Sequence, residues 1–201
     1  MLTLVTSIFA LAIAPAPLPC SYDREAILAL DFVAFDQTEG SGWRQLYEDE
    51  CFVEAAEALS DWRQNHGAQL SPDDARKAMM LRILAWHEAQ MWAFAGSDSD
   101  ALVVFESDAV MRNDEGGEAW NIYVEGTRAF LRRDRATLKA AIEGLSALPR
   151  PAGWGNAVDL EGRPIVVPWP QNLDVLEGFE RCWDEPYSVA YLCRETAQSE
   201  S

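Results

Sequence analysis

The sequence of 201 residues is poor in positive charge and in histidine. It carries 33 acidic side chains against 16 basic ones and only 2 histidines, which gives a formal net charge of −17. An acidic surface repels nucleic acid and anionic lipid headgroups, because all of them are negatively charged. The composition therefore argues against nucleic acid as a partner. Apolar residues still make up 49% of the chain, as is typical of a folded globular protein.

Familiar catalytic and cofactor-binding motifs are also absent from the sequence. It contains no Gly-x-Ser-x-Gly, no phosphate-binding P-loop, no dinucleotide-binding glycine pattern and no His-Glu-x-x-His. No Cys-x-x-Cys pair occurs, and neither histidine is close to a cysteine along the chain, so we expect no zinc site. We therefore assign no catalytic residue, expect no cofactor, and favour a protein that is not an enzyme.

The first 22 residues carry no charged side chain. Leu2 to Ala14 is a mainly apolar run, too short for a transmembrane helix, which needs roughly 20 apolar residues. Such a run followed by several prolines is typical of a secretory signal peptide. We predict that residues 1–14 are this signal, with cleavage near residues 12–14, and that the protein is periplasmic or secreted without a stable membrane span. An uncleaved anchor is the alternative.

Four cysteines remain after such a cleavage, at positions 20, 51, 182 and 193. An even number in an exported chain favours disulfides over buried free thiols, which are the alternative. Four cysteines allow three pairings. Proximity along the chain favours one bond between Cys20 and Cys51 and another between Cys182 and Cys193. Each bond would close a short loop and stabilise the fold by about 3 kcal/mol.

Apolar residues recur at helical spacing through most of the chain, which predicts an all-α fold. The segment Ser71-Pro72-Asp73-Asp74 is typical of a helix start, whereas Gly67 and Pro149 are typical of helix ends. The expected helices are 24–37, 43–47, 52–66, 71–95, 99–110, 119–132, 136–148, 172–182 and 186–193.

These helices suggest one helical domain over residues 23–149 and a helical hairpin over residues 171–195 that packs on it. Between them, residues 150–170 are rich in proline and glycine and also hold Trp154 and Trp169. A small β-hairpin is possible near residues 158–167, where two short apolar runs flank Glu161-Gly162.

A degenerate repeat links segments 85–110 and 122–147. Its recurring positions are Ala89, Trp92, Gly96, Ala101 and Phe105, matched by Gly126, Ala129, Arg133, Leu138 and Ile142. In these positions the chain resembles the tetratricopeptide repeat, a pair of antiparallel helices in which a small residue lets the second helix pack closely. The resemblance implies hairpins stacked as a short solenoid or bundle, and a protein or peptide as partner. Two further stretches, 120–135 and 168–173, look like exported bacterial helical-repeat proteins, a likeness that implies no activity.

Five residues are candidates for binding. His87 lies within a long apolar helix and would need a partner from another helix to act in chemistry. Arg128 and Arg132 belong to the main concentration of basic residues and could capture an anion. Trp154 and Trp169 lie in the proline-rich loop, where exposed aromatic rings often anchor an interface.

Three functions remain open. The first is a binding or scaffold module for a protein or peptide, which the repeat spacing and the loop tryptophans favour. The second is an acidic inhibitor or immunity-type protein for a basic enzyme, because residues 23–118 hold 21 of the acidic side chains and only 7 of the basic ones. The third is a hydrolase of an envelope polymer that uses His87 as a base. The sequence leaves the oligomeric state open.

Overall fold

The computed structural model describes residues 20–67, 75–114, 116–155, 163–164 and 166–194, and within them it is helical. This confirms the predicted all-α class. The described elements are α1 (Arg24–Leu28), the π-helical turn η1 (Val33–Gln37), α2 (Gly42–Glu48), α3 (Phe52–Gly67), α4 (Ala75–Phe94), α5 (Asp98–Phe105), the 3₁₀ turn η2 (Asp108–Val110), α6 (Glu118–Leu131), α7 (Arg135–Ser146), α8 (Leu173–Arg181) and α9 (Tyr187–Ala190).

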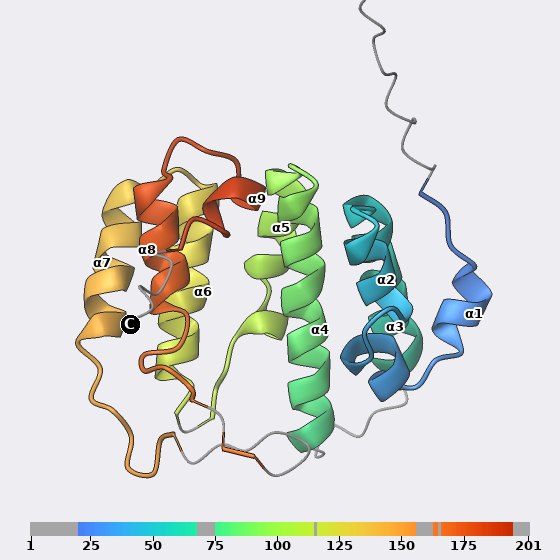
Figure 1. The fold of residues 1–201 in the computed structure, drawn as a ribbon, viewed down its shortest axis with the longest axis horizontal. Coiled ribbons are helices and arrows are strands. Elements are labelled where there is room, and N and C mark those ends of the chain that lie inside the picture. Colours follow the sequence, from blue (N-terminus) through green and yellow to red (C-terminus); the bar gives the residue numbers. More distant parts are fainter. Residues whose placement is uncertain (1–19, 68–74, 115, 156–162, 165, 195–201) are drawn as a thin grey trace, which may run out of the picture.

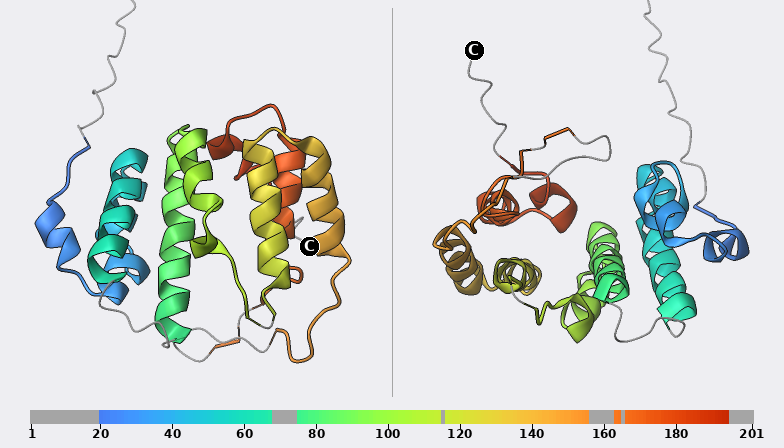
Figure 2. Two further views of the ribbon diagram at one scale, coloured as in Figure 1. Left: turned by 180° about the vertical axis from the view of Figure 1, so that it is seen from behind. Right: turned by 90° about the horizontal axis from the view of Figure 1, so that it is seen from below.

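The longer helices stand side by side in chain order, as Figure 1 shows. α3 packs against α4, α4 against α5, and α6 against α7. α8 and α9 return over one side of this row, where α8 contacts α6 and α7 and α9 contacts α4 (Figure 2, right). The C-terminal helices therefore pack on the same body as the preceding hairpins.

Two apolar cores lie on opposite sides of α4. One core joins η1, α2 and α3 to α4 through Phe35, Trp43, Leu59 and Leu84. The larger core runs from α4 to α9 and includes Trp86. Because α4 contributes to both cores, it must be apolar around much of its circumference, as its sequence predicts.

The predicted helix 24–37 is wrong as a single element, because the chain forms α1 and then η1. The carbonyl of Leu28 bonds Nε2 of His66 at 2.9 Å, and the carbonyl of Leu30 accepts a hydrogen bond from the indole of Trp62 at 3.0 Å. Asp31 then caps the next turn by accepting the backbone N–H of Ala34 at 2.9 Å. Side chains of α3 thus take the carbonyls that a continuous helix would use itself.

Most other predicted helices agree with the structure to within a few residues. The predicted helix 99–110 is divided into α5 and η2, and the predicted helix 186–193 is regular only over α9. The signal segment, the proposed helix start at Ser71 and the centre of the possible hairpin at 158–167 lie outside the described residues.

Gly126 of α6 is a point of close helix packing. A Cβ atom at this position would lie 2.7 Å from Cδ2 of Leu176 on α8 and 3.1 Å from Cβ of Ala141 on α7. Gly144 of α7 has more room, because its nearest neighbour would be Cδ1 of Ile122 at 3.9 Å. The two helical glycines therefore form a matched pair for testing the packing.

We predict opposite effects of alanine at these two glycines. Gly126→Ala should lower the free energy of unfolding by about 1–2 kcal/mol, because overpacking outweighs the gain in helix propensity. Gly144→Ala should raise it by about 0.5–1 kcal/mol. Urea unfolding followed by circular dichroism measures both; equal effects would contradict the close packing of α6 against α8.

Both cysteine pairs favoured by chain proximity are disulfides in the structure. Cys20–Cys51 ties the chain before α1 to the start of α3, across 31 residues. Cys182–Cys193 closes 11 residues and ties the end of α8 to the chain after α9. Each bond restricts the unfolded chain and so stabilises the fold.

Replacing both cysteines of a pair by alanine should therefore destabilise the protein. The loop lengths predict a loss of about 3–4 kcal/mol without Cys20–Cys51 and about 3 kcal/mol without Cys182–Cys193. Urea midpoints of the two double variants, compared with the wild type before and after reduction, measure these losses. A wild type that reduction leaves unchanged would refute the contribution.

Candidate functional site

His87 has a hydrogen-bond partner from another element, as a role in chemistry would need. Its Nδ1 lies 3.0 Å from Oδ1 of Asp36, a fully buried carboxylate in η1. The same oxygen accepts the indole N–H of Trp43 in α2 at 2.8 Å. The rings of His87 and Trp43 are in contact, with centroids 4.7 Å apart. Asp36 thus joins η1, α2 and α4 at one buried point.

Local backbone geometry positions this carboxylate. Gly42 begins α2 with φ at +57°, and a Cβ atom there would lie 2.1 Å from the carbonyl oxygen of Phe35. Only glycine tolerates both conditions, so α2 can start directly against η1. Arg44 of α2 donates to the backbone carbonyl of Asp36 and stacks on Trp43, with its guanidinium carbon 4.7 Å from the ring centroid.

The carboxylate of Asp36 is ionised at neutral pH. Burial alone would raise its pKa, but the hydrogen bond and charge of His87, the hydrogen bond of Trp43 and the charge of Arg44 together hold the pKa below the ordinary value of 3.8. An ionised carboxylate only accepts, so Nδ1 of His87 carries the proton. His87 is therefore oriented as a histidine–carboxylate pair, with Nε2 as the remaining ring nitrogen.

Two neighbouring hollows lie elsewhere, along the N-terminal half of α4. One, of about 550 Å³, lies between α4 and the segment that enters α6 and is lined by Ala78, Met79, Arg82, Ile83, Arg112, Asn113, Asp114 and Trp120. A second, of about 650 Å³, lies between α3, α4 and η2 and shares Ala78, Arg82 and Asn113 with the first. We call the two adjoining hollows the α4 groove. His87 lines neither of them.

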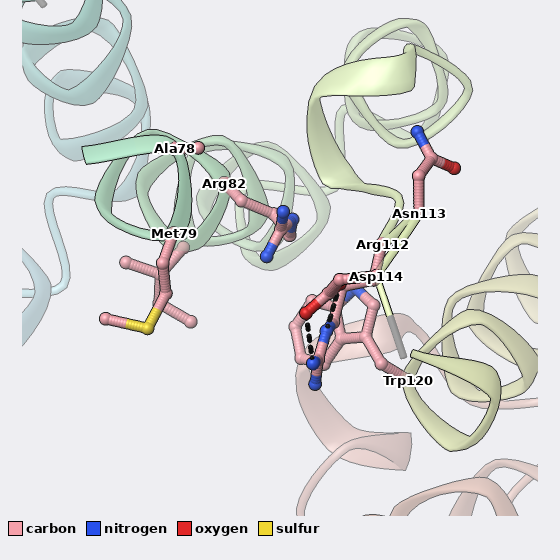
Figure 3. Close-up of a pocket in the computed structure, with 8 residues that line it drawn as sticks. Ala78, Met79, Arg82, Arg112, Asn113, Asp114 and Trp120 are labelled. Carbon is pink, nitrogen blue, oxygen red and sulfur yellow. Dashed lines mark hydrogen bonds and ion pairs between the residues drawn. The ribbon is translucent and has the colours of Figure 1, made fainter. Parts of the chain in front are cut away.

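The first hollow has a charged side and an apolar side. Arg82 projects from α4 toward residues 112–114, as Figure 3 shows, and its Nε donates to the carbonyl of Met111 at 3.0 Å. Across the hollow, Arg112 donates two hydrogen bonds, of 2.9 and 2.6 Å, to the carboxylate of Asp114. The hydrogen bond from Arg112, and to a smaller extent the charges of Arg112 and Arg82, lower the pKa of Asp114 to about 2, with burial opposing them. Asp114 thus remains an anion paired with Arg112.

The second hollow is bordered by a buried polar cluster. Arg63 of α3 pairs with Glu88 of α4. Burial raises the pKa of Glu88, although the charge and hydrogen bond of Arg63 and a hydrogen bond from Ser60 oppose the increase. Ser60 and Arg63 also line the hollow. Arg63 therefore faces the groove with its charge already balanced by Glu88.

The two predicted arginines bind other parts of the chain. Arg128 donates to the carbonyl of Phe105 at 2.7 Å, which satisfies the C-terminal end of α5, and it pairs with Glu125 at 3.3 Å. Arg132 pairs with Glu106 at 2.7 Å and with Glu125 at 3.6 Å. Both guanidinium groups hold α6 to the end of α5.

The two loop tryptophans contact each other. The rings of Trp154 and Trp169 meet edge to face, with centroids 4.6 Å apart. Their indole N–H groups donate to the carbonyls of Val167 and Leu148 at 3.0 and 3.1 Å. Both rings are partly exposed, so they fasten the loop while leaving some aromatic surface to solvent.

A possible metal cluster is already accounted for by the disulfide. Sulfur atoms of Cys20 and Cys51 lie near the carboxylate of Glu54, but both sulfurs are in the bond between the two cysteines. A disulfide sulfur is not the thiolate that binds metal ions.

Sequence reasoning missed Asp36 and Arg82. Nothing near Asp36 in the chain indicates that it meets a residue 51 positions away. Arg82 carried one signal: it is a basic residue in the acidic part of the chain, and Met79 and Ile83 stand beside it on the same helix. We found no match to this chain among protein-family models, curated proteins or solved structures. Within the described residues, no helix combines the length and apolar character needed to cross a membrane.

Removing the buried carboxylate should destabilise the protein. Asp36→Asn should cost about 3 kcal/mol at neutral pH, because it removes the buried ionised carboxylate that accepts hydrogen bonds from His87 and Trp43. The pKa of Asp36 is lowered on folding, so its contribution exists above about pH 4 and is lost as pH falls through the folded-state pKa. The wild type should therefore lose stability toward low pH more steeply than the variant does.

Urea unfolding at about pH 7, 5 and 3 measures this difference. Asp61→Asn is the matched control, because Asp61 forms a partly exposed ion pair with Arg24 and should contribute less than about 1 kcal/mol. Equal unfolding midpoints of Asp36→Asn and wild type across this range would contradict the role of Asp36.

Proposed function

We propose that the protein is an exported binding module, built of stacked tetratricopeptide-like helical hairpins, that holds a segment of a protein or peptide in the α4 groove. The observation that carries the proposal is the groove itself, which combines apolar walls with a few polar groups. Met79, Ile83 and Trp120 supply the apolar surface, while Arg82 and Asn113 supply polar groups. Ligand sites in proteins usually have this composition and a volume of about 300–1,000 Å³.

The hairpin packing supports the repeat part of the proposal. At Gly126, a position of the repeat pattern, side chains of α7 and α8 pack closely against α6. The groove lies where the α4–α5 hairpin meets the segment leading into α6, so it belongs to the junction between two hairpins. Repeat proteins commonly bind their partners on such composite surfaces.

Two disulfides support the exported location. Bonds of this kind form and persist in oxidising compartments such as the periplasm or the extracellular space. Cys20–Cys51 joins the chain before α1 to the start of α3, and Cys182–Cys193 joins the end of α8 to the chain after α9. We therefore place the binding function in the periplasm or outside the cell.

A hydrolase that uses His87 is less well supported than a binding module. The Asp36–His87 pair has the orientation that a general base needs. However, the pair also contacts Trp43 and Arg44, and the described hollows are lined by other residues. The chemistry requires substrate beside Nε2, whereas His87 lines neither hollow of the α4 groove.

An acidic inhibitor of a basic enzyme is the second candidate. The excess of negative charge over residues 23–118 favours it, since such a surface attracts a cationic partner over a long range. A partner of this kind would bind the acidic face, and its affinity would fall with added salt. It would not depend on the interior of the α4 groove.

Filling the groove should weaken peptide binding. Ala78 is exposed and lines both hollows, so Ala78→Trp places an indole within the groove without disturbing a core. We expect a displayed random-peptide library to yield peptides that bind the wild type, and we expect Ala78→Trp to weaken these peptides at least tenfold, about 1.4 kcal/mol or more.

Ala140→Trp is the matched control, because Ala140 is an exposed alanine of another helix, α7. It should bind the same peptides as tightly as the wild type in calorimetric titrations. Binding that survives in Ala78→Trp would place the site elsewhere and reject the groove. Binding that survives there and also weakens strongly with salt would favour the inhibitor.

A further inference from the structure

Arg82 differs from the other arginines of the groove in how its charge is balanced. Arg63 is paired with Glu88, and Arg112 with Asp114. Among the described residues, no carboxylate lies within ion-pair distance of Arg82, and its one hydrogen bond uses Nε. The two terminal nitrogens of Arg82 therefore remain available to a ligand in the first hollow (Figure 3).

The first hollow has a net charge of +1 from its described lining. Arg82, Arg112 and Asp114 are its titratable side chains, and the last two neutralise each other. A group with one negative charge would complete the balance. The two terminal nitrogens of a guanidinium lie side by side and match the two oxygens of a carboxylate, so a carboxylate is the anion that fits best.

The wall opposite residues 82–83 is held in place before any ligand arrives. The side-chain amide of Asn121 bonds both backbone groups of Arg112: Oδ1 accepts its N–H at 2.9 Å, and Nδ2 donates to its carbonyl at 2.7 Å. The indole of Trp120 donates to the carbonyl of Val110 at 2.6 Å. A wall fixed in this way loses little conformational freedom on binding.

The apolar side of the hollow lies next to this cationic position. Met79, one turn before Arg82 on the same helix, is 56% exposed, and Ile83 and Trp120 are partly exposed. A ligand that places an apolar group here would cover this surface and gain affinity from its burial. The hollow is therefore suited to a ligand that has a carboxylate and an apolar group close together.

We propose that the first hollow of the α4 groove captures the C-terminal carboxylate of a peptide whose last residue is apolar. This inference rests on the proposed peptide-binding function and names the part of the peptide that is recognised. A C-terminal residue carries its carboxylate and its side chain on the same carbon atom, so both reach one small hollow together. In an internal aspartate or glutamate the carboxylate is on the side chain, so any apolar group must come from a different residue.

The test compares one peptide in two forms. N-acetyl-Gly-Gly-Leu with a free carboxylate and the same peptide as its C-terminal amide are titrated into the full chain by calorimetry, with hexanoate as a small apolar acid. We expect the wild type to bind the free acid at least tenfold more tightly than the amide, because a charge-assisted bidentate pair is lost in the amide. Hexanoate should bind more weakly than the free acid.

Arg82→Gln should remove this preference, so that acid and amide bind alike. Arg82→Lys keeps the positive charge but loses the two side-by-side nitrogens of the guanidinium. It should therefore retain only part of the preference for the free acid. Arg24→Gln is the matched control: it removes an arginine that pairs with Asp61 and lines neither hollow, and it should keep the full preference. Circular dichroism verifies that each variant is folded.

Two outcomes would overturn the proposal. Equal affinity of acid and amide for the wild type, with both lost in Ala78→Trp, would reject carboxylate capture while the groove still binds peptide. Hexanoate binding as tightly as the free acid would make the hollow a site for small acids rather than for a peptide terminus. If Ala78→Trp left the affinity of the library peptides unchanged, the proposed peptide-binding function itself would be rejected instead.

Discussion

Burial of α4 on two sides is the constraint on which the rest of the structure depends. The helix separates two apolar cores and contributes to both, through Leu84 on one side and Trp86 on the other. A helix in this position cannot present a broad polar face to water, so every polar residue in its buried half needs a partner. The positions of the neighbouring elements follow from these partners.

Three polar residues near the middle of α4 each bind a different neighbour. His87 meets Asp36 of η1, Glu88 meets Arg63 of α3, and Gln90 donates to the hydroxyl of Tyr187 in α9 at 3.3 Å. Successive helical residues point about 100° apart, so one short segment can fasten neighbours on several sides. This need for partners explains why the Asp36–His87 pair is so well formed although neither residue lines the α4 groove. At the N-terminal half of α4 the same packing is less complete, and the α4 groove occupies the space.

The sequence predicted what depends on local pattern and missed what depends on distant contacts. The periodicity of α3, α6, α7 and α8 gave their bounds closely, and proximity along the chain selected both disulfides. The break between α1 and η1 was missed because Trp62 and His66 cause it from 32 and 38 residues away. His87 was identified as a candidate, but Asp36 could not be.

Arg82 shows the same limit for the groove. On its helix it is a polar residue among apolar ones, which usually indicates a solvated face. Only the packing of residues 110–114 against α4 turns that face into one side of a hollow, and this packing is a property of the folded chain.

If the groove binds a peptide as proposed, the overall acidity of the protein gives it selectivity among anions. With a net charge of −17, the protein repels small anions, and the attraction of one guanidinium acts only over a short range in salt. A free inorganic anion therefore gains little at Arg82. A carboxylate attached to an apolar group gains in addition from the burial of that group against Met79 and Trp120. The charge that argues against nucleic acid and anionic membranes as partners is thus expected also to favour, among anions, those that carry their own apolar surface into the α4 groove.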